Sequence, residues 1–423
     1  MRDFLPGQVR HRERVRAALE GVYRSYAYEP IETPALEAIE RLTTGEGGEN
    51  EGLIFRVLRR DLRDLSEVHG VDELADLGLR YDLTVPLTRY YATHSAELPT
   101  PFRSMQIGYV WRAERPQRGR FRQFMQCDID LLGEASVAAE VELLTATCDA
   151  LGATGLTGFT VRVNDRRVLL ALVASSGFPE TLSRQVLITL DKLDKVGMGG
   201  VADLLAPLEH PDAARRLLDV LAEQQVQPDI QALAKALEGG LADEVVRDVD
   251  VIVTSLVDQR MPGVEVAFDA TLVRGMGYYT GPIFEIEHAE SRGSIAGGGR
   301  YDDLVAKSGG PAVPACGMSV GFERLCEILP ESVADDDRRV VILHDEDAPL
   351  ALLLDAARRL RANGYAVGRA TRRGRVGRQL ARLEADGYHL VWEFGPTSPS
   401  PCCGLSRLAV EPGTGGLTPL MMT

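Results

Sequence analysis

Apolar residues recur at helical spacing near the start of the chain and again after residue 135. In residues 8–27, the apolar positions that fit one helical face are Val9, Val15, Ala18, Leu19 and Val22. Residues 136–152 show the same spacing, and Gly152 and Gly155 lie near the expected end. Because apolar residues three and four apart lie on one side of an α-helix, we expect an amphipathic helix in each stretch.

Other segments have the alternating or mostly apolar pattern of short strands. We expect strands at residues 105–110, 124–129, 159–163, 264–268 and 282–288. In the last of these, Ile283, Glu285 and Glu287 should lie on one face of the strand, since successive side chains point to opposite faces. Phe284, Ile286 and His288 should lie on the other face.

Residues 167–247 differ from their surroundings because helical periodicity dominates them, with prolines as punctuation. They predict a helical insertion between two parts of one domain. We therefore divide the first three quarters of the chain into residues 1–166, 167–250 and 251–332.

The last part of the chain, residues 338–423, predicts a separate small domain. Expected strands at 339–343, 365–369 and 388–394 alternate with expected helices at 349–362 and 376–386. This βαβαβ order favours a small α/β domain with parallel strands. The acidic residues 331–337 before it are typical of a linker, and residues 395–423 have the composition of a loop.

Composition adds a few limits. With 423 residues the chain should hold two or three domains, and 45% hydrophobic residues support ordinary globular cores. No apolar run reaches the ~18 residues of a membrane helix, and no signal-peptide core begins the chain, so we expect a cytoplasmic protein without membrane contact. None of the six cysteines forms a C-x-x-C pair, which makes a zinc site improbable and free thiols the expectation.

Charge is uneven along the chain. The net charge of −15 argues against a general nucleic-acid binder. Residues 338–423, however, hold 12 arginines, no lysine and only 8 acidic residues. An acidic body with a basic end suits a protein that meets a polyanion at chosen patches, although drift in surface charge would give the same totals.

The densest chemical signal is a group of arginines between two expected strands. Five of them surround Pro116 and Gly119: Arg112, Arg115, Arg118, Arg120 and Arg122. Pro and Gly mark a turn, so the segment predicts a β-hairpin with an arginine-rich loop. Guanidinium groups bind phosphate bidentately, which favours a nucleotide or a nucleic-acid end as ligand, but a solvated basic turn remains an equal alternative on arginine density alone.

The arginine-rich segment resembles motif 2 of the class II aminoacyl-tRNA synthetases, in the form of the histidyl-tRNA synthetase family. Four further blocks resemble that family in the same order along the chain. They are Arg2–Pro6 with Ile31–Pro34, Leu79–Pro86, Leu272–Gly281, and Gly297–Asp302 with Gly317–Leu325. One block would be weak evidence, whereas five in order are strong.

The resemblance implies a fold and a reaction. The fold would be an α+β class II synthetase catalytic domain with an antiparallel sheet and a helical insertion, followed by a small α/β anticodon-binding-like domain. The reaction would be activation of histidine with ATP and Mg²⁺, followed by transfer to tRNA(His), in a cytoplasmic homodimer. In-line attack at phosphorus places extra charge on phosphate oxygens, so positioning and charge stabilisation would carry the catalysis.

The resemblance also implies roles for individual residues. Arg112, Arg274 and Arg324 would be catalytic and, with Glu114, would bind ATP. Histidine would be bound by Asp82, Thr84, Gln126, Asp130, Tyr278 and Tyr279. Transfer RNA would be contacted by Arg115, Gln117, Arg118 and Arg120. Local charge, and not the resemblance, adds Arg372, Arg373 and Arg375, because residues 368–382 hold six arginines and no acidic residue. A solvated basic face is the alternative there. No protein ligand to a metal is implied.

Departures from the family pattern leave alternatives open. Asp82 and Asp130 resemble the eukaryotic and archaeal pocket, Gly277 stands where the family usually has Asp, and residues 395–423 do not match the usual end of the family. A paralogue remains possible: a regulatory subunit of histidine biosynthesis, or a histidine-activating enzyme of another pathway. Gly317–Gly321 also fits the G-x-S-x-G elbow of serine hydrolases, with Ser319 as nucleophile and Asp345 and His389 downstream.

The glycine run at residues 297–299 lacks the spacing of dinucleotide-binding and P-loop motifs. Three glycines in a strand are expected to let another group pack against bare backbone. In the resembled family that group is the substrate.

Overall fold

The computed structural model describes residues 1–43, 51–60, 70, 73–115, 121–274, 278–330, 338–394, 405–408 and 417–419. The chain forms two compact units. The first consists of residues 1–3 and 13–329, and the second of residues 4–12 and 330–423. In the described ranges no helix is both long enough and apolar enough to cross a membrane. The expected linker, residues 331–337, lies outside the described residues.

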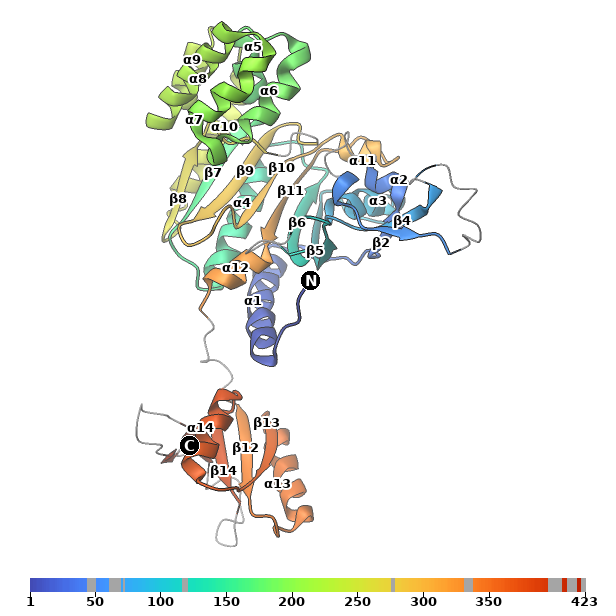
Figure 1. Ribbon diagram of the computed structural model, residues 1–423, viewed down its shortest axis with the longest axis vertical. Helices are drawn as coiled ribbons and strands as arrows, with labels where there is room; N and C mark the ends of the chain where they lie inside the picture. The colour runs from blue at the N-terminus through green and yellow to red at the C-terminus, as the bar shows by residue number, and fades with distance from the viewer. Residues whose placement is uncertain are drawn as a thin grey trace. The chain divides into compact units, whose positions relative to one another are not determined.

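A mixed eight-stranded sheet is the centre of the first unit (Figure 1). Its strands lie in the order β1-β5-β6-β11-β10-β9-β7-β8. They are β1 (Glu29–Pro30), β5 (Phe102–Trp111), β6 (Gln123–Leu132), β7 (Phe159–Asp165), β8 (Val264–Phe268), β9 (Pro282–His288), β10 (Ala296–Arg300) and β11 (Ala315–Gly321). Neighbours are antiparallel except for the parallel pairs β1–β5 and β7–β8. The expected antiparallel sheet is therefore confirmed for its centre, and both ends are parallel.

The expected hairpin around the arginine-rich loop is confirmed. Strands β5 and β6 pair without interruption from Phe102 opposite Leu132 to Trp111 opposite Gln123. The side chain of Arg80 joins this hairpin to the preceding segments by donating hydrogen bonds to the carbonyl oxygens of Thr33 (2.7 Å) and Tyr109 (2.9 Å).

One face of the sheet is apolar and covered by helices. On β6, Cys127, Ile129 and Leu131 are buried in a core that α1 (Pro6–Ser25), α4 (Ala138–Ala153) and α12 (Phe322–Ile328) complete. The helices expected at 8–27 and 136–152 are thus confirmed. Because side chains alternate along a strand, the residues between these positions face the opposite side of the sheet, where the polar residues collect.

A smaller sheet, which the sequence pattern did not predict, lies beside the large one. Its order is β2-β4-β3. Its elements and the short helices nearby are β2 (Leu36–Ala38), β3 (Arg56–Leu58), β4 (Ala75–Leu79), α2 (Ile39–Thr43), α3 (Thr84–His94) and the 3₁₀ turn η1 (Glu51–Leu53). The strands are only three to five residues long, so no long alternating run marks them.

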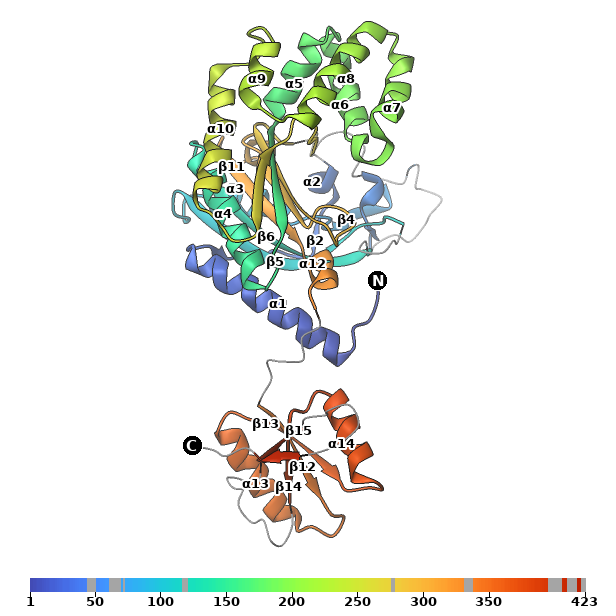
Figure 2. The ribbon, with the colours of Figure 1, turned by 90° about the vertical axis from the view of Figure 1, so that its left-hand side faces the viewer.

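The helical insertion is present as a layer of helices at one end of the large sheet (Figures 1 and 2). Its elements are α5 (Arg166–Ser175), α6 (Ser183–Leu190), α7 (Leu193–Leu205), α8 (Pro211–Val226), α9 (Ile230–Ala236), α10 (Asp243–Asp258) and the 3₁₀ turns η4 (Glu180–Leu182) and η5 (Ala206–Leu208). The boundary expected at residue 250 falls inside α10. Its first half packs into the insertion core through Val249, and its second half packs under the sheet through Ile252 and Leu256.

The second unit contains the expected βαβαβ arrangement. Its elements are β12 (Arg339–His344), α13 (Leu350–Ala362), β13 (Ala366–Thr371), α14 (Val376–Ala385) and β14 (Leu390–Glu393). Strand β12 lies between β13 and β14 and is parallel to both, as predicted.

The expectation of a loop over residues 395–423 is wrong in part. Strand β15 (Leu405–Leu408) pairs antiparallel with β14, and β16 (Leu417–Pro419) pairs with β15. Backbone groups at a sheet edge favour such pairing. The prolines and glycines around these short strands hid them from the sequence pattern.

A buried ion pair fixes α4 to the large sheet. The Arg300 side chain at the end of β10 donates from Nε and Nη2 to the carboxylate of Glu140, at 2.5 and 2.8 Å. The Glu140 side chain is 0% exposed. Because it lies in the first turn of α4, its charge also interacts favourably with the helix dipole. Arg300 therefore has a structural role within the glycine block.

We predict that Arg300→Met strongly destabilises the first unit, because it leaves the Glu140 carboxylate buried without its cation. Such losses typically cost about 3–5 kcal/mol. Urea unfolding followed by circular dichroism would measure the change. Arg215→Ala is the matched control, since the Arg215–Asp212 pair is exposed on α8 and should contribute little. Equal, small losses in both variants would contradict the prediction.

Candidate active site

The polar face of the large sheet carries one continuous row of residues across six strands. Backbone pairing aligns them in the order Gln106, Asp128, Ser319, Gly297, Glu285 and Arg162, on β5, β6, β11, β10, β9 and β7. Gln126 and Asp130 flank Asp128 on β6 and share its face, because they are two residues away. Residues far apart in the sequence are thus placed side by side.

Strand β6 presents three buried oxygen atoms that lack a hydrogen-bond donor among the described residues. They are Oε1 of Gln126, Oδ1 of Asp128 and Oδ2 of Asp130. An unsatisfied buried acceptor costs about 1–3 kcal/mol, so three in a row are unusual unless a ligand supplies donors. This part of the site therefore suits a ligand with several N–H groups and positive charge.

The carboxylates of the site hold their protons unusually tightly. Burial raises the pKa of Asp130 to about 7, and the nearby charge of Asp82 adds to this against the hydrogen bond from Tyr301. Burial likewise raises the pKa of Asp82 to about 6, against the Val85 N–H and the Arg112 charge. Burial and then Asp130 raise the pKa of Asp128 well above its usual range. A bound cation would oppose all three shifts.

Tyr301 contacts Asp130 and belongs to a group of three neighbouring tyrosines. The Tyr301 hydroxyl donates to Oδ1 of Asp130 at 2.5 Å, and the Tyr301 ring lies 6.5 Å from that of Tyr278, centroid to centroid. Tyr278 and Tyr279 have their ring centroids 4.4 Å apart and their hydroxyls 3.2 Å apart. The structure thus brings together predicted residues of the imidazole site and adds Tyr301. Its position two residues after the glycine run was the available signal.

The glycines of β10 and β11 leave room for charged and aromatic side chains of the protein itself. A Cβ on Gly297 would overlap the guanidinium of Arg274, and one on Gly317 would overlap the Asp130 carboxylate. A Cβ on Gly299 would lie 3.0 Å from the Tyr279 ring. The expectation that the substrate itself occupies this space needs correction, because side chains of the site pack against the bare backbone.

Two of the predicted arginines meet at Ser294. Arg274 donates from Nη1 to the carboxylate of Glu285 and lies 3.4 Å from the Ser294 hydroxyl. Arg324, on α12, donates to the Ser294 carbonyl oxygen at 2.5 Å. Hence the two guanidinium groups lie on the same side of the site, although 50 residues separate them in the sequence.

Arg112 lies at the opposite side of the row, at the end of β5. Its Nε donates to the Tyr81 carbonyl at 2.9 Å, and its guanidinium lies 5.1 Å from the Phe124 ring centroid. It therefore adjoins Asp82, whose carboxylate accepts from the Val85 N–H at 3.1 Å.

Two other predicted residues, Thr84 and Glu114, lie near Asp82 and near the end of β5. Thr84 begins α3, two residues after Asp82. Glu114 lies just beyond β5, and its carbonyl accepts from Arg122 at 3.2 Å.

The tip of the arginine-rich loop lies outside the described residues. This applies to Gln117, Arg118 and Arg120, and also to Gly277 in the block before Tyr278. Arg115, the last described residue before the tip, is exposed.

The serine hydrolase hypothesis is wrong. Ser319 lies inside β11, between antiparallel partners, whereas a nucleophile elbow needs a sharp turn after a strand of a parallel sheet. Its hydroxyl instead contacts Nε2 of Gln126 at 2.7 Å. The suggested partners Asp345 and His389 belong to the other unit. Ser319 thus holds the Gln126 amide so that Oε1 remains available.

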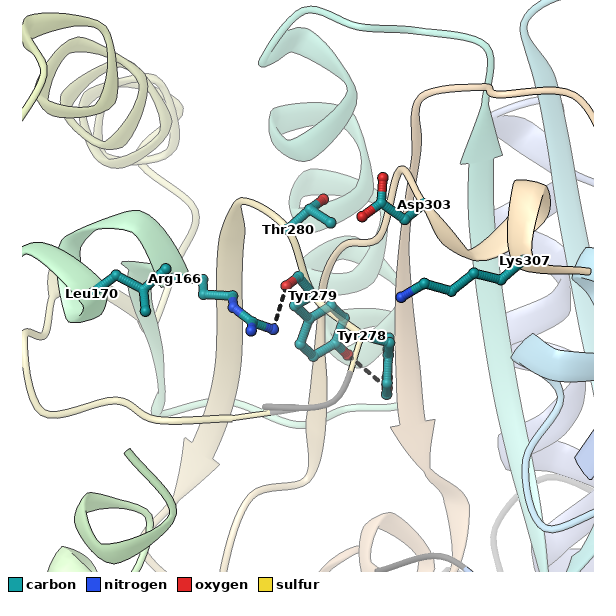
Figure 3. Close-up of a pocket in the computed structure, with 7 residues that line it drawn as sticks. All are labelled: Arg166, Leu170, Tyr278, Tyr279, Thr280, Asp303 and Lys307. Atoms are coloured by element: carbon teal, nitrogen blue, oxygen red, sulfur yellow. Dashed lines mark hydrogen bonds between the residues drawn. The ribbon is translucent and has the colours of Figure 1, made fainter. Parts of the chain in front are cut away.

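A cavity of about 240 Å³ adjoins the two neighbouring tyrosines (Figure 3). Its lining residues are Arg166, Leu170, Tyr278, Tyr279, Thr280, Asp303 and Lys307, the last at the end of α11 (Leu304–Lys307). The Arg166 guanidinium points toward Tyr279 and donates to its carbonyl oxygen at 2.8 Å. Of these lining residues, only the two tyrosines were predicted from the sequence. Arg166 is therefore a link between the insertion and the tyrosine segment.

The predicted arginines of the second unit differ in their surroundings. Arg372 forms ion pairs with Asp345 at 3.2 Å and with Glu393 at 3.8 Å, so acidic residues of its own domain partly neutralise its charge. Arg373 and Arg375 are exposed on either side of Gly374, which has a positive φ of 62°. The exposed pair is thus better placed to meet a polyanion than Arg372.

Comparison with known proteins identifies the family. The pattern of histidyl-tRNA synthetases matches residues 1–325. A histidine–tRNA ligase of Leifsonia xyli subsp. xyli is 45% identical over 403 residues, covering 92% of each chain. A probable histidine–tRNA ligase of Tropheryma whipplei is 41% identical over 417 residues, covering 94% of this chain and 95% of the relative.

A solved structure agrees with the sequence relatives. The crystal structure of histidyl-tRNA synthetase from Nostoc sp. PCC 7120 is 26% identical and superposes with a TM-score of 0.77, covering 96% of this chain and 93% of that one. The match therefore spans both units and is not limited to the catalytic blocks. From its sequence, its fold and the residues assembled on its sheet, the chain belongs to the histidyl-tRNA synthetase family.

Proposed function

We propose that the chain activates histidine with ATP and transfers the histidyl group to tRNA(His). In the first step a histidine carboxylate oxygen attacks the α-phosphorus of ATP, forming histidyl-adenylate and releasing pyrophosphate. In the second, a hydroxyl of the terminal adenosine of the tRNA attacks the histidyl carbonyl and AMP leaves. The proposal is carried by the row of buried acceptors on β6 beside three arginines, in a chain of this family.

The acceptors suit the two ends of histidine. Asp82, Thr84 and Gln126 would hold the α-ammonium group, which brings three N–H donors and a positive charge. Asp130 would accept from the imidazole N–H, with Tyr278 and Tyr279 around the ring. A buried carboxylate left without that N–H disfavours apolar amino acids of similar size.

The arginines suit the phosphates. Arg112 and Arg274 would stabilise charge on the α-phosphate, Arg324 would hold the γ-phosphate, and Glu114 would help bind ATP. No protein nucleophile is needed, because the substrates react directly once they are aligned. Fixed guanidinium groups lower the barrier by meeting charge as it develops.

Three further parts of the proposal come from the family resemblance. Mg²⁺ bound to the ATP phosphates would supply additional charge relief. Among the described residues, no group of three or more His, Cys, Asp or Glu side chains could hold a metal ion. The protein would act as a homodimer in the cytoplasm, with residues near Pro30–Pro34 at the subunit interface.

Transfer RNA would meet the chain at two places. The arginine-rich loop, with Arg115, Gln117, Arg118 and Arg120, would approach the acceptor end. The second unit would bind elsewhere on the tRNA through Arg372, Arg373 and Arg375, at a turn and helix start where backbone N–H groups also favour phosphate.

We predict that Arg274→Ala lowers histidine-dependent ATP–pyrophosphate exchange by ~10²–10³-fold, the usual cost of removing one donor that stabilises transition-state charge. Arg215→Ala removes an exposed arginine from the insertion and serves as the control. Near-normal exchange in the Arg274 variant would refute the role assigned to it.

We predict that Asp130→Asn weakens histidine binding and leaves ATP binding intact. In the wild type, KM for histidine should rise as the pH falls from 8 to 6, because the Asp130 carboxylate has a pKa of about 7 and loses its charge over this range. The variant should show a high KM and lose this part of the pH dependence, while titration of the substrate imidazole affects both proteins alike. Matching pH profiles would contradict the assignment.

We predict that the double variant Arg373→Ala, Arg375→Ala raises KM for tRNA in aminoacylation and leaves pyrophosphate exchange unchanged. Each lost phosphate contact should also make binding less sensitive to salt. The control removes Arg358 and Arg359, which are exposed on α13 in the same unit. If both pairs affect tRNA equally, the effect reflects overall charge and no specific contact surface.

A further inference from the structure

Glu285 belongs to the polar row of the large sheet, and its side chain contacts Arg274, the predicted catalytic arginine. It lies on β9, opposite Gly297 on one side and Arg162 on the other. Its carboxylate bonds Arg274 and has a side-chain exposure of 17%. We propose that Glu285 is a positioning residue that fixes the Arg274 guanidinium for the attack on the α-phosphate; this inference rests on the proposed function.

Four features hold the Arg274 guanidinium in one place, the first being a hydrogen bond with the Tyr279 side chain. The Glu285 carboxylate and the Ser294 hydroxyl both contact Nη1. The bare backbone of Gly297 provides the space beneath the group, which a Cβ would fill. Fixing a long arginine side chain costs rotamer entropy, and these contacts offset that cost. They therefore favour one orientation of the guanidinium.

Glu285 is itself held from behind. Its Oε2 lies 3.9 Å from Nη1 of Arg162. Arg162 in turn donates to Asp269 at 2.6 Å and to Glu287 at 2.5 Å. Charges therefore alternate along the row from Arg162 through Glu285 to Arg274, and the carboxylate has a fixed place on β9.

The arrangement leaves Arg274 able to bind phosphate. Both of its contacts with Glu285 and Ser294 use Nη1, whereas a guanidinium carries five N–H donors in all. The Arg274 side chain is 33% exposed, so the pair lies at the wall of the site. Glu285, Ser294 and the Tyr279 side chain thus orient the group, and with five N–H donors the guanidinium can still offer some to phosphate oxygens.

Glu287 offers a matched control on the same strand and face. It pairs with Arg162 more closely than Glu285 does, at 2.5 Å, and is 41% exposed. Removing its charge perturbs the same ion-pair network without touching Arg274. A merely structural role for the network would make the two glutamates equivalent.

The experiment measures histidine-dependent pyrophosphate exchange for the wild type, Glu285→Gln, Glu287→Gln, Arg274→Ala and the double variant Arg274→Ala, Glu285→Gln. Thermal unfolding is followed for each. We expect Glu285→Gln to lower kcat by ~10- to ~100-fold with KM for histidine unchanged, since small misplacements of a catalytic group cost this much. Glu287→Gln should remain close to wild type. In the double variant Glu285→Gln should add nothing to Arg274→Ala.

Other outcomes would overturn the inference. A kcat equal to or above wild type in Glu285→Gln would mean that Glu285 does not position Arg274 for catalysis. An additional loss in the double variant would mean that Glu285 acts through another group. Failure of the proposed function is distinguishable, because the wild type would then show no exchange with histidine.

Discussion

The constraint on which this site depends is the burial of several carboxylates on one face of a sheet. Asp128 and Asp130 project from the same strand, with Asp82 close enough to raise the pKa of each. Like charges in a medium of low dielectric constant repel, so the pocket is stable only if protons or cations accompany them. Arginines at both ends of the row, and a cationic substrate between them, satisfy that requirement. Under the proposed function, the charge pattern that would bind histidine therefore also orders the residues that would bind ATP.

Two other properties of the sheet make this burial possible. Strict alternation along β6 places Ile129 and its apolar neighbours under α1 and α4 while the acidic residues face the site. Glycines on the adjacent strands let Arg274 and Asp130 lie flat against bare backbone, where any larger residue would displace them. The Arg300–Glu140 pair then anchors the glycine strand to α4 from the apolar side. The predicted site residues thus owe their positions to residues that need not touch a substrate.

Much of this could be predicted from the sequence, because periodicity and motif order are local. The hairpin around the arginine-rich loop and the βαβαβ domain were both predicted with bounds close to those observed. The parts that were missed depend on contacts between distant segments. The roles of Asp128 and Glu285 became visible only once the register of β6 and β9 was known, because a strand pattern predicts which face a residue lies on but not its partner on the next strand. Strands β15 and β16 were missed because they have no strand pattern of their own. They are defined only by their pairing at the edge of the sheet.

The buried carboxylates also connect the site to the folding equilibrium. In the unfolded chain Asp82 and Asp130 would titrate near their ordinary values, whereas in the fold their pKa values are about 6 and 7. The folded state therefore holds extra protons between these limits, and stability falls as the pH rises through the folded-state values. At neutral pH and above, the buried, ionised carboxylates of the empty pocket lower the free energy of unfolding. If histidine binds there as proposed, its positive charge would stabilise the folded state as well as place the substrate.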